Sequence, residues 1–353
     1  MKASRWPVIA VVLVILVIGS SAMAGEQSAW LKDAESVCSQ AFAETGLKPS
    51  DANLLILTNA GYGQIGSEPT ETFLDVITKV SGCTTGTRSL LPVHSSVHDP
   101  LWFSIYRKDT GKLVFARWTG DKFEQQTIEA SPEKIFTRER WAAAASGLIG
   151  PNLFSVVSLS LSWAESPPWP LLMSAMFHDH FCPGVNAGYL AGEFLKEQLP
   201  LGPGDKYVFV TAPGKCAADA LQVMYNATAG KSGGFSMTIG SKQAAAYKAG
   251  DVPPFTVAMR VNAKKDVCDG LVLGFDWPHA YKDTGVTAEE HSPKGGQADP
   301  MFWIARAKMS MQMAQMPLEK KLGYIVVIKK FAGKAGLANE VSGGDPYAVA
   351  WKH

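Results

Sequence analysis

One pattern occurs twice along this chain of 353 residues, and it constrains the fold more than any other feature. In each copy, a short apolar run ends at a threonine, Thr58 or Thr211, and a helical stretch follows. The spacing from an aspartate to a glycine in that stretch is eleven residues in both Asp75–Gly86 and Asp219–Gly230. Matching landmarks in the same order predict a tandem duplication.

The order of elements expected in each copy is helix, strand, helix, strand, strand, helix, strand, and the first copy's last strand falls at Val156–Trp163. Helices mixed with short β-branched strands predict an α+β fold, with one α/β sandwich per copy. We predict the first copy at residues 25–166, the second at 167–335 and a polar tail at 336–353. The Pro-rich segment 165–170 is typical of a stiff linker.

The amino terminus, residues 1–24, reads as a secretory signal peptide. Lys2 and Arg5 precede an apolar run at Val8–Gly19, which is shorter than the roughly 20 helical residues that span a bilayer. Ala22–Ala24 has the small-x-small pattern of a cleavage site. We therefore expect a periplasmic or extracellular protein with no membrane span after cleavage; an uncleaved anchor is the alternative.

The charge balance argues against one class of partner. The chain has 33 Lys and Arg against 32 Asp and Glu, without basic clusters. Nucleic-acid binding needs phosphate neutralisation, so we expect no nucleic-acid partner. Five cysteines are too few for a disulfide scaffold in so long a chain.

The start of the second copy has the highest density of potentially reactive side chains. Two imidazoles, a carboxylate and a thiol lie within residues 178–182: those of His178, His180, Asp179 and Cys182. Pro183 suits the first turn of a helix and places Cys182 at its N-terminus, where the helix dipole favours a thiolate. Glycines at positions 184, 188 and 192 would form a smooth seam on one face of that helix. Glycine costs about 1 kcal/mol relative to Ala inside a helix, so the seam needs a packing reason.

A second thiol, Cys216, follows a strand at Val208–Val210 and stands at the entrance to a helix from about residue 217 to 226. Histidine and cysteine are ligands for zinc, iron or copper. His178, His180 and Cys182 from one loop, with Cys216 from another, are therefore candidate ligands of one ion. The alternatives are small buried thiols with helix-capping histidines, or a Cys182–Cys216 disulfide.

Three segments resemble the FmdE family, which takes its name from formylmethanofuran dehydrogenase. The family pattern has a His-Gly-His-x-Cys-Pro-Gly loop, a Cys-x-x-Asp-Ala-Ile-Gln helix start and a Gly-Cys-Thr-x-Gly-Lys segment. The corresponding segments are His178–Gly184, Cys216–Gln222 and Thr228–Lys231, and the resemblance covers residues 178–277. The first copy resembles a diverged relative, most clearly at Gly82–Gly86.

The resemblance implies an α+β core that binds a metal, most readily zinc, through the loop histidines and cysteine. It also implies a pseudo-dimer of the two copies within one chain. Asp179 replaces the central glycine of the loop, and Ala227 replaces a cysteine that the first copy keeps as Cys83. Asp179, Asp219 and Lys231 are auxiliary candidates, as further ligands or as acceptors that orient an imidazole.

Three hypotheses follow. The first is a secreted metal-binding protein that holds zinc, with iron, copper or haem as other candidates, and a small ligand or cofactor beside the metal. The second is a metal-dependent or thiol-redox enzyme outside the cytoplasm. The third is a partner-binding protein with a structural disulfide. His94 and His98 have helical ligand spacing, but their Pro- and Ser-rich surroundings predict a loop of surface or interface histidines.

Overall fold

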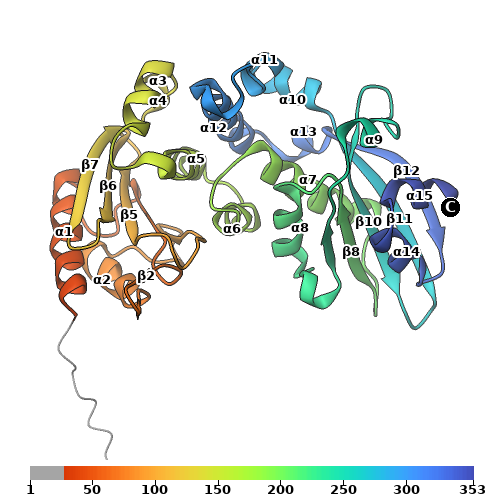
Figure 1. The fold of residues 1–353 in the computed structure, drawn as a ribbon, viewed down its shortest axis with the longest axis horizontal. Coiled ribbons are helices and arrows are strands. Elements are labelled where there is room, and N and C mark those ends of the chain that lie inside the picture. Colours follow the sequence, from red (N-terminus) through yellow and green to blue (C-terminus); the bar gives the residue numbers. More distant parts are fainter. Residues whose placement is uncertain (1–27) are drawn as a thin grey trace, which may run out of the picture.

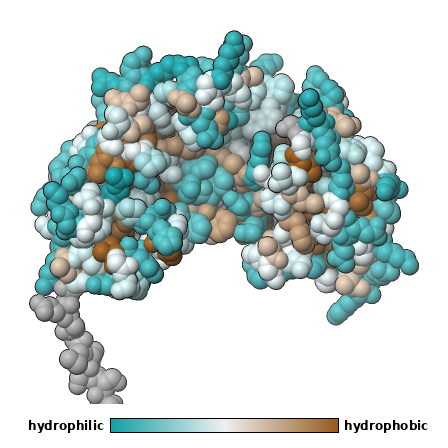
Figure 2. Space-filling view, viewed as in Figure 1, coloured by the Kyte–Doolittle hydropathy of each residue, from teal (hydrophilic) through white to brown (hydrophobic). Residues whose placement is uncertain are grey.

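The computed structural model describes residues 28–353 (Figure 1). The predicted signal peptide, residues 1–24, lies outside the described residues. Two five-stranded sheets stand at opposite ends of an arch, and the helices between them include α5 (Leu153–Ala164), α6 (Trp169–Phe177) and α12 (Pro300–Gln315). Figure 2 shows that this face of the molecule is hollowed between the two ends. The first half is residues 28–166 and the second is residues 167–353.

The sheet of the first half has the strand order β4-β1-β5-β6-β7. Strand β4 runs parallel to β1, and the other neighbours are antiparallel. The strands are β1 (Leu54–Thr58), β4 (Leu90–Pro92), β5 (Trp102–Arg107), β6 (Lys112–Trp118) and β7 (Phe123–Glu129). The other elements are α1 (Ala29–Thr45), α2 (Thr72–Ser81), α3 (Pro132–Ile135), α4 (Arg138–Ala145), the turn η1 (Gly150–Asn152) and the hairpin β2 (Gln64–Ile65) and β3 (Glu68–Pro69).

Strand β1 is buried on both faces, which explains its unbroken apolar sequence. Leu54 and Ile56 belong to the core under α1 and α2, whereas Leu55 and Leu57 belong to a second core that contains α5. Successive side chains of a strand point to opposite faces. Helices therefore cover both sides of this sheet.

The sheet of the second half has the order β9-β8-β10-β11-β12, with β9 parallel to β8 and the other neighbours antiparallel. Its strands are β8 (Lys206–Thr211), β9 (Gly234–Ser236), β10 (Pro254–Asn262), β11 (Val267–Phe275) and β12 (Ile325–Gly333). The remaining helices are α7 (Pro183–Gln198), α8 (Ala217–Tyr225), α9 (Ser241–Ala245), α10 (Trp277–Thr284), α11 (Ala288–His291), α13 (Leu318–Leu322), α14 (Leu337–Gly343) and α15 (Pro346–Lys352), with the turns η2 (Ala229–Lys231) and η3 (Gly296–Ala298).

The two sheets have the same strand order and the same strand directions when read from the short parallel edge strand, β4 or β9. In both halves, a helix (α1 or α7) directly precedes the first strand and another (α2 or α8) lies between that strand and the edge strand. The halves differ where α10 to α13 lie between β11 and β12, since β6 passes directly into β7. Helices with mixed sheets confirm the α+β prediction.

The expected strand at Val156–Trp163 is wrong, because these residues lie within helix α5. The alternation of Leu and Ser imitates a strand, but α5 is buried on almost all sides between the first sheet and α12. A helix that is buried all round has no polar face, so its sequence lacks the usual helical pattern.

The expected polar tail also differs from the structure. Residues 336–353 include helices α14 and α15, which pack on the second sheet. Val341 and Tyr347 are fully buried in the core that contains Val208 and Val210. The few apolar side chains of this segment therefore anchor it on the second sheet.

A single hydrophobic core joins the two halves. It contains Leu55 and Leu57 of the first sheet, side chains of α5 and α7, and Phe209 and Leu273 of the second sheet. The Pro-rich segment 165–170 thus connects two halves that share a core.

Candidate metal centre

A short loop between α6 and α7 carries three of the four predicted ligands, His178, His180 and Cys182. Helix α7 begins at Pro183 with Cys182 as its N-cap, as predicted, and the Cys182 sulfur accepts a hydrogen bond from the Val185 amide at 3.4 Å. Asp179 has a φ of 66°, a left-handed conformation that glycine adopts most easily. This backbone conformation is one that suits the glycine at the corresponding position of the His-Gly-His-x-Cys-Pro-Gly pattern.

The first half holds this loop from outside. Ser158 of α5 accepts a hydrogen bond from the Phe181 amide at 3.1 Å, and the His94 amide donates to the Met176 carbonyl at 2.9 Å. The ring of His94 also stacks on Phe177, with 5.3 Å between centroids. The prediction that His94 lies in a loop is confirmed.

Helix α8 delivers the fourth predicted ligand, because Cys216 is its N-cap residue just beyond β8. The glycine seam of α7 explains how the two helices approach. A Cβ on Gly184 would lie 2.9 Å from the Cys216 Cβ, and one on Gly188 would lie 2.4 Å from the Ala217 carbonyl oxygen. Gly192 faces the other end of α8. The seam thus brings Cys216 against the N-terminus of α7.

The four predicted ligands converge in space. Each of His178, His180, Cys182 and Cys216 offers one ligand atom, and these atoms all lie within 4.8 Å of one another. Tetrahedral zinc with bonds of about 2.0–2.3 Å places its ligand atoms between about 3 and 4 Å apart, so a contraction of about 1 Å would complete such a shell.

Each imidazole is oriented by a carboxylate. The Nδ1 atom of His178 lies 2.6 Å from Asp219 Oδ2, and the Nδ1 atom of His180 lies 2.5 Å from Asp179 Oδ1. A carboxylate at Nδ1 leaves Nε2 available for a metal and fixes the ring. The predicted auxiliary residues Asp179 and Asp219 are therefore close to the cluster.

One atom of the cluster lacks a partner. The Nε2 atom of His178 is buried, and none of the described residues forms a hydrogen bond with it. A buried polar atom without a partner costs free energy, so its presence beside two thiols calls for an explanation. The cluster offers two nitrogen and two sulfur donors. Such a donor set, when tetrahedral, suits zinc or an iron–sulfur centre.

The two thiols have opposite pKa shifts. Proximity to Cys182 and then to His178 and His180 lowers the pKa of Cys216 far below its usual range. Burial and the neighbouring Cys216 raise the pKa of Cys182 well above its usual value. Burial and the neighbouring Cys216 therefore oppose the thiolate that the helix N-terminus was expected to favour at Cys182.

The pKa values of both histidines are raised in the same arrangement. Burial by itself lowers the pKa of His178, but Asp219 and Cys216 raise it to about 10. The pKa of His180 is also raised, chiefly by Asp179 against the opposing effect of burial. A metal ion would therefore displace protons from this cluster.

Sequence reasoning missed Arg306 of α12, a half-buried cation near the two thiols. Burial lowers its pKa, and Cys182 and Cys216 oppose that shift. Its Nη1 donates to the His291 and Phe302 carbonyl oxygens at 2.6 and 2.8 Å. Arg306 adds positive charge beside the thiols, but nothing in its sequence surroundings marks this role.

The remaining candidates lie apart from the cluster. Lys231 is exposed and donates to Asn226 Oδ1 at 2.5 Å. His98 is exposed in its loop, and Cys83 is buried in the first half, in the same core as Cys38. All five cysteines fall within the described residues and are unpaired.

Comparison with known families agrees with the location of this site. Residues 177–319 match the family described as "FmdE, Molybdenum formylmethanofuran dehydrogenase operon". This range holds the loop, α7, α8 and all four converging residues, so the family match falls on the segment for which the sequence predicted the resemblance. No curated protein matches the chain.

Among residues 28–353, no helix combines the length and the apolar character that crossing a membrane requires.

Proposed function

We propose that this chain is a metal-binding protein of the FmdE type that holds one zinc ion through His178, His180, Cys182 and Cys216. The convergence of these four ligand atoms within 4.8 Å carries the proposal. Asp179 and Asp219 orient the imidazoles through their Nδ1 atoms. Zinc bound there would supply a Lewis-acidic centre with a fixed position.

Metal analysis of the purified full chain tests this proposal. One zinc per chain is expected in the wild-type protein, and far less than one in His180→Ala and Cys182→Ser. Matched controls are His98→Ala and Cys268→Ser, which change the same residue types away from the cluster and should keep the metal. Full metal content in both site variants would show that this ligand set is wrong, and iron or copper in place of zinc would correct the metal.

The proposal includes a location outside the cytoplasm and a duplicated chain. The basic start, apolar run and Ala22–Ala24 pattern support secretion, and cleavage would leave Gly25 as the first residue. The common strand order of the two sheets supports a duplication in which the halves pair as a pseudo-dimer. Intact-mass measurement of protein exported by the cell tests the cleavage position.

A thiol-redox function is the second candidate, favoured by the opposite pKa shifts of Cys182 and Cys216. Such a pair has one reactive and one buried sulfur. Alkylation of native protein before and after zinc addition separates the two functions. Zinc that protects both thiols supports the metal site, whereas a bridge that forms in air and resists zinc supports the dithiol.

A further inference from the structure

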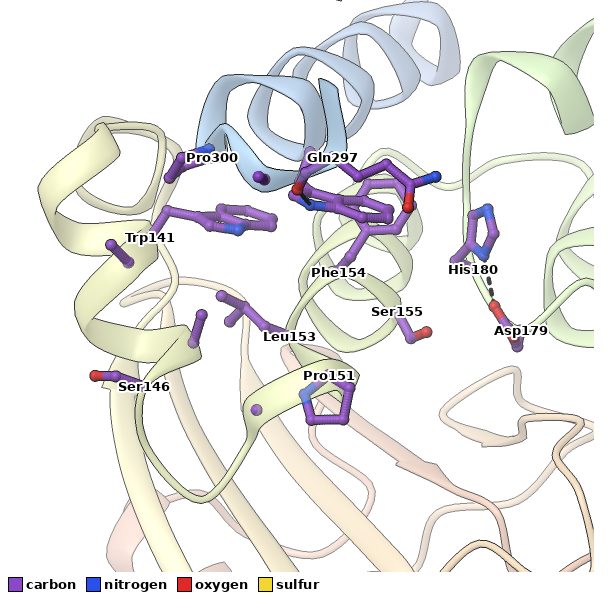
Figure 3. A pocket seen from close by; sticks show the side chains of 15 residues that line it. Trp141, Ser146, Pro151, Leu153, Phe154, Ser155, Asp179, His180, Gln297 and Pro300 are labelled. Carbon is purple, nitrogen blue, oxygen red and sulfur yellow. Dashed lines mark hydrogen bonds and ion pairs between the residues drawn. The ribbon is translucent and has the colours of Figure 1, made fainter. Parts of the chain in front are cut away.

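A cleft of about 800 Å³ lies between the two halves, beside the candidate metal centre. Its wall from the first half consists of residues of α4, η1 and α5 within 141–155, and its wall from the second half consists of Asp179, His180 and residues of η3 and α12 within 297–303. Figure 3 shows Trp141 toward one end of this space, Phe154 in the middle and His180 with Asp179 toward the other end. Ligand pockets in proteins have volumes of about 300–1,000 Å³, so the cleft is large enough for an organic molecule.

Aromatic rings connect the cleft with the metal centre. The ring of Phe154 lies 4.9 Å from that of His180 and 5.0 Å from that of Trp303. The indole Nε1 of Trp303 donates to the Gln297 carbonyl at 2.9 Å, which fixes this ring in the wall. Trp141 adds a third large ring. Flat rings of this kind favour a flat, apolar or aromatic occupant.

In the zinc-loaded chain, where His180 would be neutral, the charge of the cleft disfavours anions although Asp179 Oδ1 is hydrogen-bonded to His180 Nδ1. Asp179 is the carboxylate among the described residues that line it, and none of those residues is Lys or Arg. Arg138 of α4 is paired with Asp299, the N-cap residue of α12. A carboxylate beside aromatic faces attracts cations and tolerates neutral molecules, whereas a carboxylate or phosphate on the ligand would face Asp179.

We propose that this cleft binds a flat aromatic small molecule that is neutral or cationic, next to the metal centre. The proposal rests on the proposed function, because His180 is both a candidate metal ligand and part of the cleft wall. Binding would place the ligand's ring against Phe154 and Trp303, and its polar or cationic group toward Asp179.

Three indole compounds of different charge serve as probes for calorimetric titration of the zinc-loaded full chain at neutral pH. Tryptamine is a cation, indole-3-acetamide is neutral and indole-3-acetate is an anion. We expect tryptamine and the amide to bind at least tenfold more tightly than the acetate. We expect Asp179→Asn to reduce the difference between tryptamine and the acetate. Equal affinity for all three, or no binding of any, would overturn the proposal.

The wall itself offers a matched pair of blocking variants. Ala142 and Ala145 of α4 line the cleft and are exposed, so a tryptophan at either position would fill the cleft without entering the core. Ala143 is exposed on the same helix and does not line the cleft. Ala142→Trp and Ala145→Trp should each weaken tryptamine binding at least tenfold, and Ala143→Trp should leave it unchanged. Equal binding in all three variants would place the indole elsewhere and refute the cleft.

Metal content, measured on each sample, keeps the two proposals separable. A wild-type protein that binds tryptamine in the cleft but holds no metal supports the cleft and refutes the zinc site. A protein with stoichiometric zinc that binds none of the probes refutes the cleft and supports the zinc site.

Discussion

The glycine seam between α7 and α8 is the feature on which the geometry of the metal centre depends most directly, and Gly188→Ala tests it. The added Cβ would lie 2.4 Å from the Ala217 carbonyl oxygen, 2.7 Å from the Ala217 Cα and 2.8 Å from the Ala220 Cβ. None of these atoms can rotate away. Restoring an ordinary contact requires α7 and α8 to separate by about 1 Å, since packed interiors hold no spare space.

The energetic cost follows from two opposing effects. Overpacking costs about 1–3 kcal/mol, at the upper end here because the clash involves backbone atoms. Alanine in place of glycine inside a helix returns about 1 kcal/mol. We therefore expect a net destabilisation of about 2 kcal/mol, which corresponds to a fall in Tm of about 3–6 °C.

The effect on the site should exceed the effect on stability. Ala217 is adjacent to Cys216, so the displaced backbone carries this candidate ligand with it. Metal–ligand distances vary by about 0.2 Å in a formed site, and a shift of several tenths of an ångström therefore disrupts one bond. We expect zinc affinity to fall at least tenfold.

Thermal unfolding and zinc titration against a competing chelator measure the two effects. Gly343→Ala in α14 is the matched control, since a Cβ there meets nothing within 4 Å and should leave both Tm and zinc affinity unchanged or slightly raise Tm. A Gly188→Ala protein with the Tm and zinc affinity of the wild type would refute the argument that close helix packing positions Cys216.

Three further predictions concern protons and the carboxyl terminus. Zinc affinity should rise with pH from about 6 to 8, because the raised pKa values of His178 and Cys182 mean that zinc displaces their protons; a flat profile in chelator-competed titrations would contradict this. Burial lowers the pKa of His291 to about 4, so the unfolded chain takes up a proton at a higher pH than the folded chain. The wild-type protein should therefore lose up to about 3 kcal/mol of its free energy of unfolding as the pH falls from 6.5 toward 4. Thermal unfolding over the same interval should show a smaller loss for His291→Gln. Tyr347→Ala should cost about 3–5 kcal/mol, and Trp351→Ala, which alters a partly exposed ring, much less; equal Tm values would show that α15 is not part of the core.

The chemistry of the site was predictable because most of it is local in sequence. The loop from His178 to Cys182 gathers its donors within five residues, and Pro183 fixes where the helix begins. Regularly spaced glycines require a close neighbour, and that neighbour is α8, which starts after Cys216. The α+β class was predictable for the same reason, since short apolar runs alternate with helical stretches.

What the sequence could not predict depends on burial by distant segments. The alternation of Leu and Ser in α5 would indicate a strand only if the serine side faced solvent. Here α12 of the second half packs against α5, and the serines are buried. The pKa of Cys182 is raised by burial, and side chains outside the loop contribute to that burial. The cleft is lined by Trp141 of the first half and Trp303 of the second, residues that lie far apart in the sequence.

The first half lacks the His-x-His-x-Cys loop, and its contacts indicate what it contributes instead. Ser158 accepts a hydrogen bond from the backbone between His180 and Cys182, and Phe154 packs against the His180 ring. Both side chains belong to α5, which packs on α12 and shares with the first sheet the core that spans both halves. Because ordering a loop costs conformational entropy for every residue fixed, these contacts lower the entropy that a metal would have to offset. The first half therefore supports the candidate metal centre, and the second half alone would present the same four candidate ligands on a less constrained loop.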